Sequence, residues 1–217
     1  LEKERSTLSK LEEFEKAYEI QRKINAINYV TSPTYEKFDH KINPNLDEDL
    51  RYKELMELKT CLLKHNVEVN NLNRIECYDI SNISGTNATG SMVVFINGEK
   101  DPSQYRKFRI INLPNFPNLP NDFAMMQQVI SRRLKHKEWD FPDLIIVDGG
   151  KGQVTSAVKV LMEKNLNVPV IGLAKKEETI ITSSFDEIKL PKESEALKLL
   201  MRIRDEAHRF AITYHKK

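Results

Sequence analysis

Two short apolar runs on either side of a helical segment constrain the fold of this chain more than any other feature of its sequence. Residues 144–147 and 169–173 are mostly aliphatic and do not alternate with polar residues, and residues 152–164 between them have helical periodicity. Strands that are apolar throughout are typical of parallel strands covered on both faces. The sequence therefore predicts an α/β domain with parallel strands in a covered sheet.

Three shorter β-type runs precede this unit: 74–80, 90–96 and 105–111. Asn97-Gly98 is a typical hairpin turn between the second and the third run. The remaining elements expected are helices over 121–136 and 193–214 and a small hairpin at 183–184. A meander followed by alternating helices and strands favours a ribonuclease H-like mixed sheet with flanking helices. A doubly wound dinucleotide fold would need helices between its first strands.

Residues 1–73 differ from the rest of the chain because their pattern is helical. Segments 2–27 and 46–65 each have helical spacing of apolar residues, and a polar stretch with Pro33 and Pro44 separates them. We therefore interpret 1–73 as an α-helical extension and 74–217 as the α/β domain. The chain begins without Met, and we expect it to be part of a longer protein.

Composition excludes several classes of protein. The 217 residues carry a net charge of +2, with 30% charged and 40% hydrophobic residues, which indicates a globular domain with a sizeable core. Cys61 and Cys77 lack the spacing of a disulfide framework or a zinc site. No run approaches about 20 consecutive apolar residues and no apolar signal segment begins the chain, so we expect a cytoplasmic protein that does not bind membranes.

Two aspartates occupy corresponding places in two predicted strands. Asp79 lies near the end of the first strand, and Asp148 directly follows the apolar run 144–147. If these strands are parallel neighbours, their ends bring the two carboxylates together. Two close carboxylates repel each other when ionised, so they share a proton or hold a divalent cation. The alternative is that each aspartate caps a nearby turn.

The segment 148–153, Asp-Gly-Gly-Lys-Gly-Gln, contains three of the seven glycines of the chain. A glycine turn between a strand and a helix lets backbone amides approach an anion, and Lys151 next to Gly150 adds positive charge. The segment has neither the third glycine of a dinucleotide fingerprint nor the Lys-Ser/Thr of a Walker A loop. The alternative is that the glycines only allow the helix to pack closely on the strand.

Arg204 and His208 continue an apolar stripe of the last predicted helix, which includes Leu197, Met201 and Ala211. We therefore expect both side chains to face inward, where they need polar partners. A carboxylate–metal centre would supply such partners, and for His208 a backbone group or Asp205 would serve equally.

Basic residues recur along the domain, and they include Arg106, Arg109, Arg132, Arg133, Lys135, Lys175, Lys176 and Arg202. In the run 105–109, strict alternation would place Arg106 and Phe108 on one side of a strand and Tyr105, Lys107 and Arg109 on the other. Together these residues could track a nucleic-acid backbone. The alternative is a solvated charged face.

Long stretches of the chain resemble the C-terminal endonuclease half of the UvrC family, the incision subunits of bacterial nucleotide excision repair. These stretches are 74–81, 90–95, 105–108, 121–123, 132–133, 142–153, 172–177 and 203–210. The resemblance implies a ribonuclease H-like endonuclease that cuts damaged double-stranded DNA on the 5′ side of a lesion with Mg²⁺ or Mn²⁺. The family's catalytic set falls on Asp79, Asp148 and His208, and a further important aspartate falls on Asp122.

From this resemblance we assign Asp79 and Asp148 as metal ligands, and His208 as a third ligand or as the residue that orients water or phosphate. The residues expected to contact DNA phosphates are Gly150, Lys151, Arg106, Arg109, Arg132, Arg133 and Arg204. Asn82 departs from the family pattern, in which many members have His. The family's N-terminal nuclease domain and C-terminal helix-hairpin-helix repeats do not occur in this sequence, so we expect weak DNA binding and poor cutting by this chain alone.

Residues 1–30 resemble the UVR motif, the amphipathic helical hairpin through which UvrC docks to UvrB. The residues assigned to this contact are Leu11, Phe14, Glu15 and Ala17. Two rival functions stay open. One is a catalytically silent adaptor for DNA and UvrB with the same fold, and the other is a nucleotide-binding α/β enzyme that uses the glycine turn.

Overall fold

The computed structural model describes residues 46–81, 88–110, 121–174 and 178–212. The chain divides into two compact units, Leu1–Asp47 and Glu48–Lys217. Nearly all described residues belong to the second unit, which contains the whole sheet and the helices that cover it.

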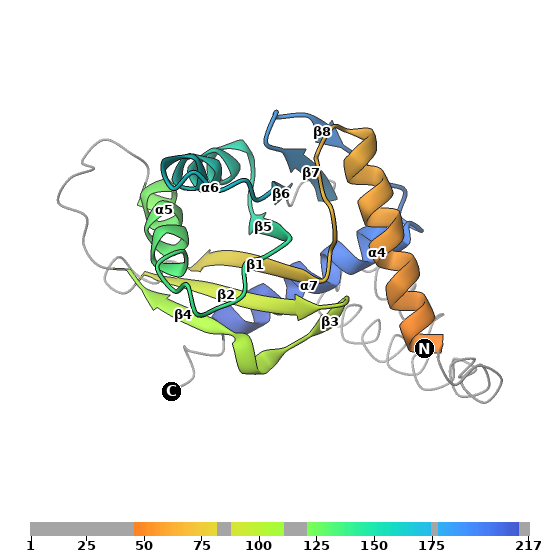
Figure 1. Ribbon diagram of the computed structural model, residues 1–217, viewed down its shortest axis with the longest axis horizontal. Coiled ribbons are helices and arrows are strands. Elements are labelled where there is room, and N and C mark those ends of the chain that lie inside the picture. Colours follow the sequence, from red (N-terminus) through yellow and green to blue (C-terminus); the bar gives the residue numbers. More distant parts are fainter. Residues whose placement is uncertain (1–45, 82–87, 111–120, 175–177, 213–217) are drawn as a thin grey trace, which may run out of the picture. The chain divides into compact units, whose positions relative to one another are not determined.

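The second unit is built around an eight-stranded mixed sheet with the order β3-β2-β1-β5-β6-β7-β8, and β4 pairs with β2 beside β3 (Figure 1). The strands are β1 (Arg74–Ser81), β2 (Thr89–Ile96), β3 (Glu99–Lys100), β4 (Arg106–Arg109), β5 (Leu144–Asp148), β6 (Val170–Ala174), β7 (Thr179–Thr182) and β8 (Glu187–Ile188). The central strands β1, β5 and β6 are parallel, and the outer pairs are antiparallel. The predicted meander followed by a parallel centre is therefore confirmed.

Helices cover both faces of this sheet. They are α4 (Leu46–Lys64), α5 (Asn121–Arg133), α6 (Lys151–Glu163) and α7 (Glu195–Ile212), with a short 3₁₀ helix, η1 (Pro102–Gln104). Figure 1 shows α7 behind β1 and β2, with α5 and α6 on the other side of the sheet. Alternation along β1 fits this arrangement, because Glu76 contacts Arg133 of α5 whereas Asp79 contacts His208 of α7.

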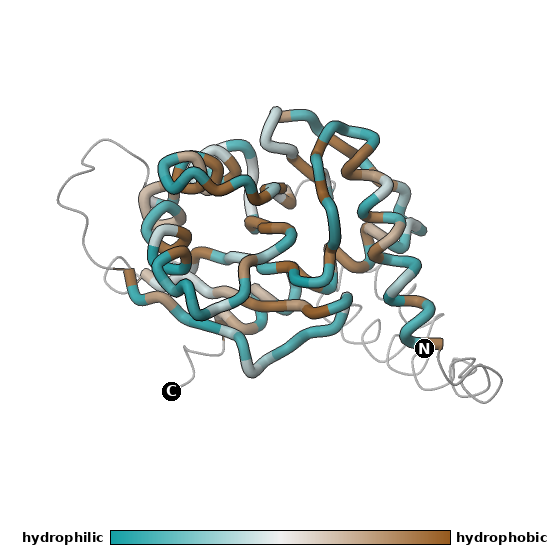
Figure 2. Tube along the Cα trace, in the orientation of Figure 1, coloured by the Kyte–Doolittle hydropathy of each residue, from teal (hydrophilic) through white to brown (hydrophobic). Residues whose placement is uncertain are grey.

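The core explains why the central strands are apolar throughout. Residues 144–147 of β5 and 170–173 of β6 are all buried, because helices cover both of their faces. Figure 2 shows β5 and β6 as largely hydrophobic segments. Among the described helices, none is long and apolar enough to cross a lipid bilayer.

One expectation about element boundaries needs correction. Asn97-Gly98 does form the turn after β2, with left-handed φ values of +50° and +79°, but it leads into the two-residue β3. β4 starts only after η1 and pairs with β2 independently. The compact unit that contains the sheet begins at Glu48, and α4 buries Leu58 and Leu62 in its core. The division of the chain at residue 73 stays a prediction.

Candidate metal centre

Asp79 and Asp148 lie side by side because their strands are parallel neighbours. Tyr78 of β1 pairs with Val147 of β5, so each aspartate is the next residue along its strand. Residues at matching positions of parallel strands point to the same face. The two carboxylates therefore project together from the carboxyl ends of β1 and β5, on the face that α7 covers, and the convergence expected from the sequence is confirmed.

His208 of α7 completes a cluster with the two carboxylates. Its Nδ1 atom lies 3.6 Å from Oδ2 of Asp79. One potential ligand atom from each of Asp79, Asp148 and His208 lies within 4.8 Å of the other two, and this is the only such group of acidic, His or Cys side chains among the described residues. The side chain of Asp79 is 10% exposed and that of His208 is 56% exposed, so solvent reaches the cluster from the α7 side.

The expectation that Arg204 and His208 face inward is wrong for His208, whose side chain is 56% exposed, but it holds for Arg204, which is largely buried and paired. The buried side of α7 is formed by Ala196, Leu197, Leu199, Leu200, Ile203, Glu206, Ala207 and Ala211. His208 lies beside this face and is exposed. Arg204 is 14% exposed and forms ion pairs with Glu178, at the start of the β7 hairpin, and with Asp205. Arg204 is therefore already neutralised, which argues against its assignment as a DNA phosphate contact.

The donor atoms of the cluster suit a hard divalent cation. Carboxylate oxygens are preferred ligands of Mg²⁺ and Mn²⁺, and imidazole nitrogen is acceptable to Mn²⁺. Cys77 lies on the same face of β1, but burial raises the pKa of its thiol well above the ordinary value, and the negative charges of Asp148 and Asp79 raise it further. The thiol is therefore protonated without metal, and Cys77 is not a member of the three-residue group.

In the glycine turn after Asp148, Gly152 is needed for close packing, whereas Gly150 has open space around it. A Cβ atom on Gly152 would lie 2.2 Å from ring atoms of Phe123 in α5, so a side chain there would collide. A Cβ atom on Gly150 would meet only the Ile181 side chain, at 3.9 Å. Gly150 is the N-cap of α6, beside Asp148, and Lys151 forms an exposed ion pair with Glu187 at 3.0 Å. Close packing therefore explains Gly152 but not Gly150.

Asp122 lies outside the cluster. It is exposed in the first turn of α5, whose next residue, Phe123, packs against Gly152 at the start of α6. This contact brings the first turns of α5 and α6 together on the side of the sheet opposite α7. Asp122 is thus near the edge where β5 ends, but it is not a member of the three-residue group.

The predicted basic surface separates into two faces. Arg106 of β4 lies over the ring of Trp139 at 4.9 Å, and Arg132 of α5 lies over Phe108 at 5.7 Å. Lys107 instead lies over Phe210 of α7, at 4.6 Å. The alternation expected for β4 is therefore confirmed for Arg106, Lys107 and Phe108. Arg106 and Arg132 lie on the α5 side, whereas the aspartate–histidine cluster is on the α7 side.

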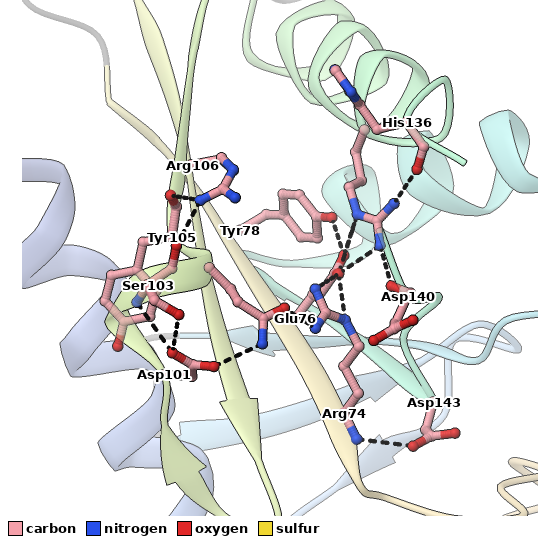
Figure 3. Close-up of polar contacts among 12 residues, drawn as sticks. Arg74, Glu76, Tyr78, Asp101, Ser103, Tyr105, Arg106, His136, Asp140 and Asp143 are labelled. Atoms are coloured by element: carbon pink, nitrogen blue, oxygen red, sulfur yellow. Dashed lines mark hydrogen bonds and ion pairs between the residues drawn. The ribbon is translucent and has the colours of Figure 1, made fainter. Parts of the chain in front are cut away.

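Arg133 is not part of any surface, which contradicts its assignment as a phosphate contact. Its side chain is 1% exposed, and its Nη2 atom donates to Oε1 of Glu76 at 2.9 Å and to the carbonyl of Asp140 at 2.5 Å. Glu76 also accepts from Arg74 at 3.0 Å and from the hydroxyl of Tyr78 at 2.6 Å (Figure 3). The fully buried carboxylate of Glu76 thus joins β1 to α5.

Glu76 was not among the residues singled out from the sequence. The signal available was a glutamate inside an otherwise buried strand, in the run Arg-Ile-Glu-Cys-Tyr-Asp-Ile, because a buried carboxylate must be paired. Leu11, Phe14, Glu15, Ala17, Asn82, Lys175 and Lys176 lie outside the described residues.

Curated relatives match much of this chain. UvrABC system protein C of Chlorobium phaeobacteroides is 50% identical over 149 residues, which cover 67% of this chain and 23% of the relative. The protein of the same name from Methanococcoides burtonii is 45% identical over 177 residues, covering 79% of this chain and 28% of the relative. The chain thus spans about a quarter of the length of these curated relatives.

Among solved structures, endonuclease V of Ciona intestinalis in complex with inosine-containing DNA is 17% identical, with a TM-score of 0.34, over 62% of this chain and 56% of that chain. This likeness is too slight to carry an argument.

The family match, by contrast, covers the whole sheet. Residues 64–212 match the family described as the UvrC RNase H endonuclease domain, and this range includes every described strand and all three members of the cluster. The match and the mixed sheet with its flanking helices agree with the ribonuclease H-like fold expected from the sequence. The chain belongs to the UvrC family, and residues 64–212 form its ribonuclease H endonuclease domain.

Proposed function

We propose that this chain is the metal-dependent DNA endonuclease part of a nucleotide excision repair protein, and that it makes the 5′ incision at a damaged site. The observation that carries the proposal is the cluster of Asp79, Asp148 and His208 at the carboxyl ends of two parallel strands, inside a domain of the UvrC endonuclease family. Its substrate is damaged double-stranded DNA, and the cation is Mg²⁺ or Mn²⁺.

In this proposal Asp79 and Asp148 hold the cation, because their carboxylates are adjacent and would otherwise repel each other. A bound divalent cation supplies charge neutralisation at the phosphate and lowers the pKa of a water nucleophile. His208 is the most accessible member of the cluster, so its imidazole serves at the solvent side, as a ligand or as the residue that orients water and phosphate.

DNA binding is assigned to exposed or half-buried basic groups in this proposal. Arg106, Arg109 and Arg132 belong to the edge formed by β4 and α5, and Arg132 Nη1 donates to the carbonyl of Arg109 at 2.5 Å. Gly150 and Lys151 lie next to Asp148 and would contact the phosphate nearest the cut. Asp122 acts near the edge of the sheet where β5 ends, without being a ligand. Arg133 and Arg204 are left out because buried or half-buried carboxylates already pair with them.

The partner UvrB is assigned to residues 1–30, through Leu11, Phe14, Glu15 and Ala17. This assignment and the cytoplasmic location stay predictions.

The decisive experiment is a nicking assay on a duplex with one defined lesion, with UvrB present and with Mg²⁺ or Mn²⁺ added. The wild-type chain should nick the damaged strand on the 5′ side, and Asp148→Asn should reduce the rate at least about 100-fold, since a ligand of the cation is lost. Asp186→Asn, which changes an exposed carboxylate on the β7–β8 turn, is the matched control and should cut like wild type.

The alternative function, a silent adaptor, makes the opposite prediction. An adaptor would bind the lesion duplex and UvrB but would not nick, and Asp148→Asn would leave its binding unchanged. Nicking that persists in a folded Asp148→Asn variant would remove the nuclease assignment from this cluster.

A further inference from the structure

Ser91 of β2 carries a buried hydroxyl that the fold itself does not use. Its side chain is 0% exposed, and Oγ has no hydrogen-bond partner among the described residues. A buried hydroxyl without a partner is costly, and such groups are rare in folded proteins. An alanine at this position would avoid that cost, so packing gives no reason for serine.

The position of Ser91 in the sheet relates it to the aspartate–histidine cluster. Ser91 is the direct cross-strand partner of Asp79 in the antiparallel pairing of β1 with β2. Directly opposite residues of an antiparallel pair share a face, and their Cβ atoms lie about 4.5–5.5 Å apart. Ser91 therefore points to the same face of the sheet as Asp79, on the strand directly beside it.

On the two adjacent strands, Asp79 is the neighbour of Ser91 that can accept a hydrogen bond. The other cross-strand neighbour is Lys107 of β4, whose ammonium group lies 4.6 Å from the centre of the Phe210 ring of α7. Lys107 is a donor only, whereas Ser91 needs an acceptor for its proton. The carboxylate of Asp79 accepts hydrogen bonds, and its side chain is itself 10% exposed.

We propose that Ser91 is a positioning residue of the metal centre, whose hydroxyl donates a hydrogen bond to the carboxylate of Asp79 when that carboxylate holds a divalent cation. The inference rests on the proposed function, since it requires that Asp79 is a ligand. Groups behind a ligand fix its orientation, and their loss typically weakens metal binding by 10- to 100-fold, on the order of the loss we expect here. The cost of the idle hydroxyl in the metal-free protein is recovered when the cation binds.

This role predicts opposite effects of Ser91→Ala on metal binding and on stability. Removal of an unpartnered buried hydroxyl should leave the melting temperature of the metal-free chain unchanged or raise it. The same substitution should raise the Kd for Mn²⁺ about 10-fold. With damaged duplex as substrate, kcat at limiting Mn²⁺ should fall while KM for DNA stays unchanged. If the role of Ser91 were purely structural, its loss would not weaken Mn²⁺ binding while leaving the melting temperature of the metal-free chain unchanged or raised.

The experiment is calorimetric titration of the 217-residue chain with Mn²⁺, together with thermal melting without metal. Thr182→Val is the matched control, because Thr182 is a buried hydroxyl residue whose Oγ1 accepts from the Asp186 amide at 3.1 Å, and it pairs with Ile171 at the far end of β6. The control should lower the melting temperature and leave the Kd for Mn²⁺ unchanged.

Each result decides the proposal. An unchanged Kd in Ser91→Ala overturns it, and so does a lowered melting temperature that accompanies weaker binding, because the hydroxyl would then serve the fold. If Ser91→Ala does not fold, Ser91→Cys keeps the volume with a weak donor, and unchanged Mn²⁺ binding in that variant overturns the proposal. Failure of the proposed function looks different, since neither wild type nor Asp148→Asn would then show specific Mn²⁺ binding.

Discussion

Arg133 and Glu76 form a fully buried ion pair, in which Nη2 of the guanidinium lies 2.9 Å from Oε1 of the carboxylate, and Arg74 pairs with the same oxygen. Three charges are thus held between β1 and α5, with Tyr78 as an additional donor (Figure 3). Glu76 is three residues before Asp79 on the same strand, so this network also fixes the strand that carries one half of the carboxylate pair.

The first prediction concerns the stability supplied by Glu76. Glu76→Gln would leave two buried guanidinium groups without their shared counter-charge, and we expect a loss of about 3–5 kcal/mol in the free energy of unfolding. Urea denaturation measures this loss. Glu99→Gln is the control, since Glu99 is exposed and lies 3.6 Å from Arg51, and it should cost less than about 1 kcal/mol. Equal losses in the two variants would contradict a special role for Glu76.

The second prediction concerns the two adjacent carboxylates. In metal-free buffer, Asp79→Asn and Asp148→Asn should each raise the melting temperature by a few degrees, because the repulsion between the carboxylates is removed. Saturating Mn²⁺ should raise the melting temperature of the wild type but not of these variants. Asp122→Asn should keep the wild-type response, because Asp122 lies outside the cluster. Loss of the Mn²⁺ response in Asp122→Asn would place that residue among the ligands.

The third prediction concerns Gly152. An alanine here would put Cβ 2.2 Å from the Phe123 ring, so we expect Gly152→Ala to destabilise the domain by about 1–3 kcal/mol. Phe123→Leu should relieve part of this cost, which makes the double variant more stable than the sum of the two single changes. Chemical denaturation of the four proteins measures the coupling. Simple additivity would show that the helices separate at no cost.

The fourth prediction concerns the pH dependence of stability at Glu206. Its hydrogen bond from Arg209 holds the pKa of the Glu206 carboxyl below the ordinary value, against the opposing effect of burial, and the Tyr105 hydroxyl adds to the lowering. The stability gained from ionised Glu206 is therefore complete above the unfolded pKa, about 4.3, and it disappears as the pH falls through the lower folded value. The difference in unfolding free energy between wild type and Glu206→Gln should shrink on acidification. A constant difference would contradict the lowered pKa.

The fifth prediction concerns the basic edge of β4 and α5. Arg106→Ala and Arg132→Ala should each weaken DNA binding and reduce the slope of log K against log salt by about 1, one contact per residue. Lys164→Ala changes an exposed charge at the far end of α6 and should leave the slope unchanged. Fluorescence anisotropy measures the binding of a duplex at several salt concentrations. An unchanged slope in both arginine variants would place DNA on another face.

Local patterns were enough to predict most of the fold and the meeting of Asp79 with Asp148. Both depend on short-range signals, namely unbroken apolar strands and an aspartate at the end of each strand. The buried face of α7 was harder to predict. Two stripes are possible, one through Arg204 and His208 and one through Ile203 and Ala207, and they differ by a shift of a single residue. Packing against β1 and β2 selected the second.

Whether each arginine is exposed or buried could not be predicted from the residues next to it in the sequence. Arg132 and Arg133 are adjacent and identical in chemistry, yet only Arg133 faces Glu76 of β1. Its burial depends on a residue far away in the sequence. The membership of α4 in the sheet unit is similar, since it follows from where Leu58 and Leu62 pack and not from the polar stretch that precedes the helix.

The three donors of the cluster come from the first strand, from a strand in the middle of the domain and from its last helix. During synthesis on the ribosome, Asp79 and Asp148 emerge well before His208. A nascent chain therefore has both carboxylates, but the cluster is complete only when α7 has been made and has docked. Premature termination anywhere before α7 would yield a product without the third member of the cluster, which under the proposed function would not nick DNA.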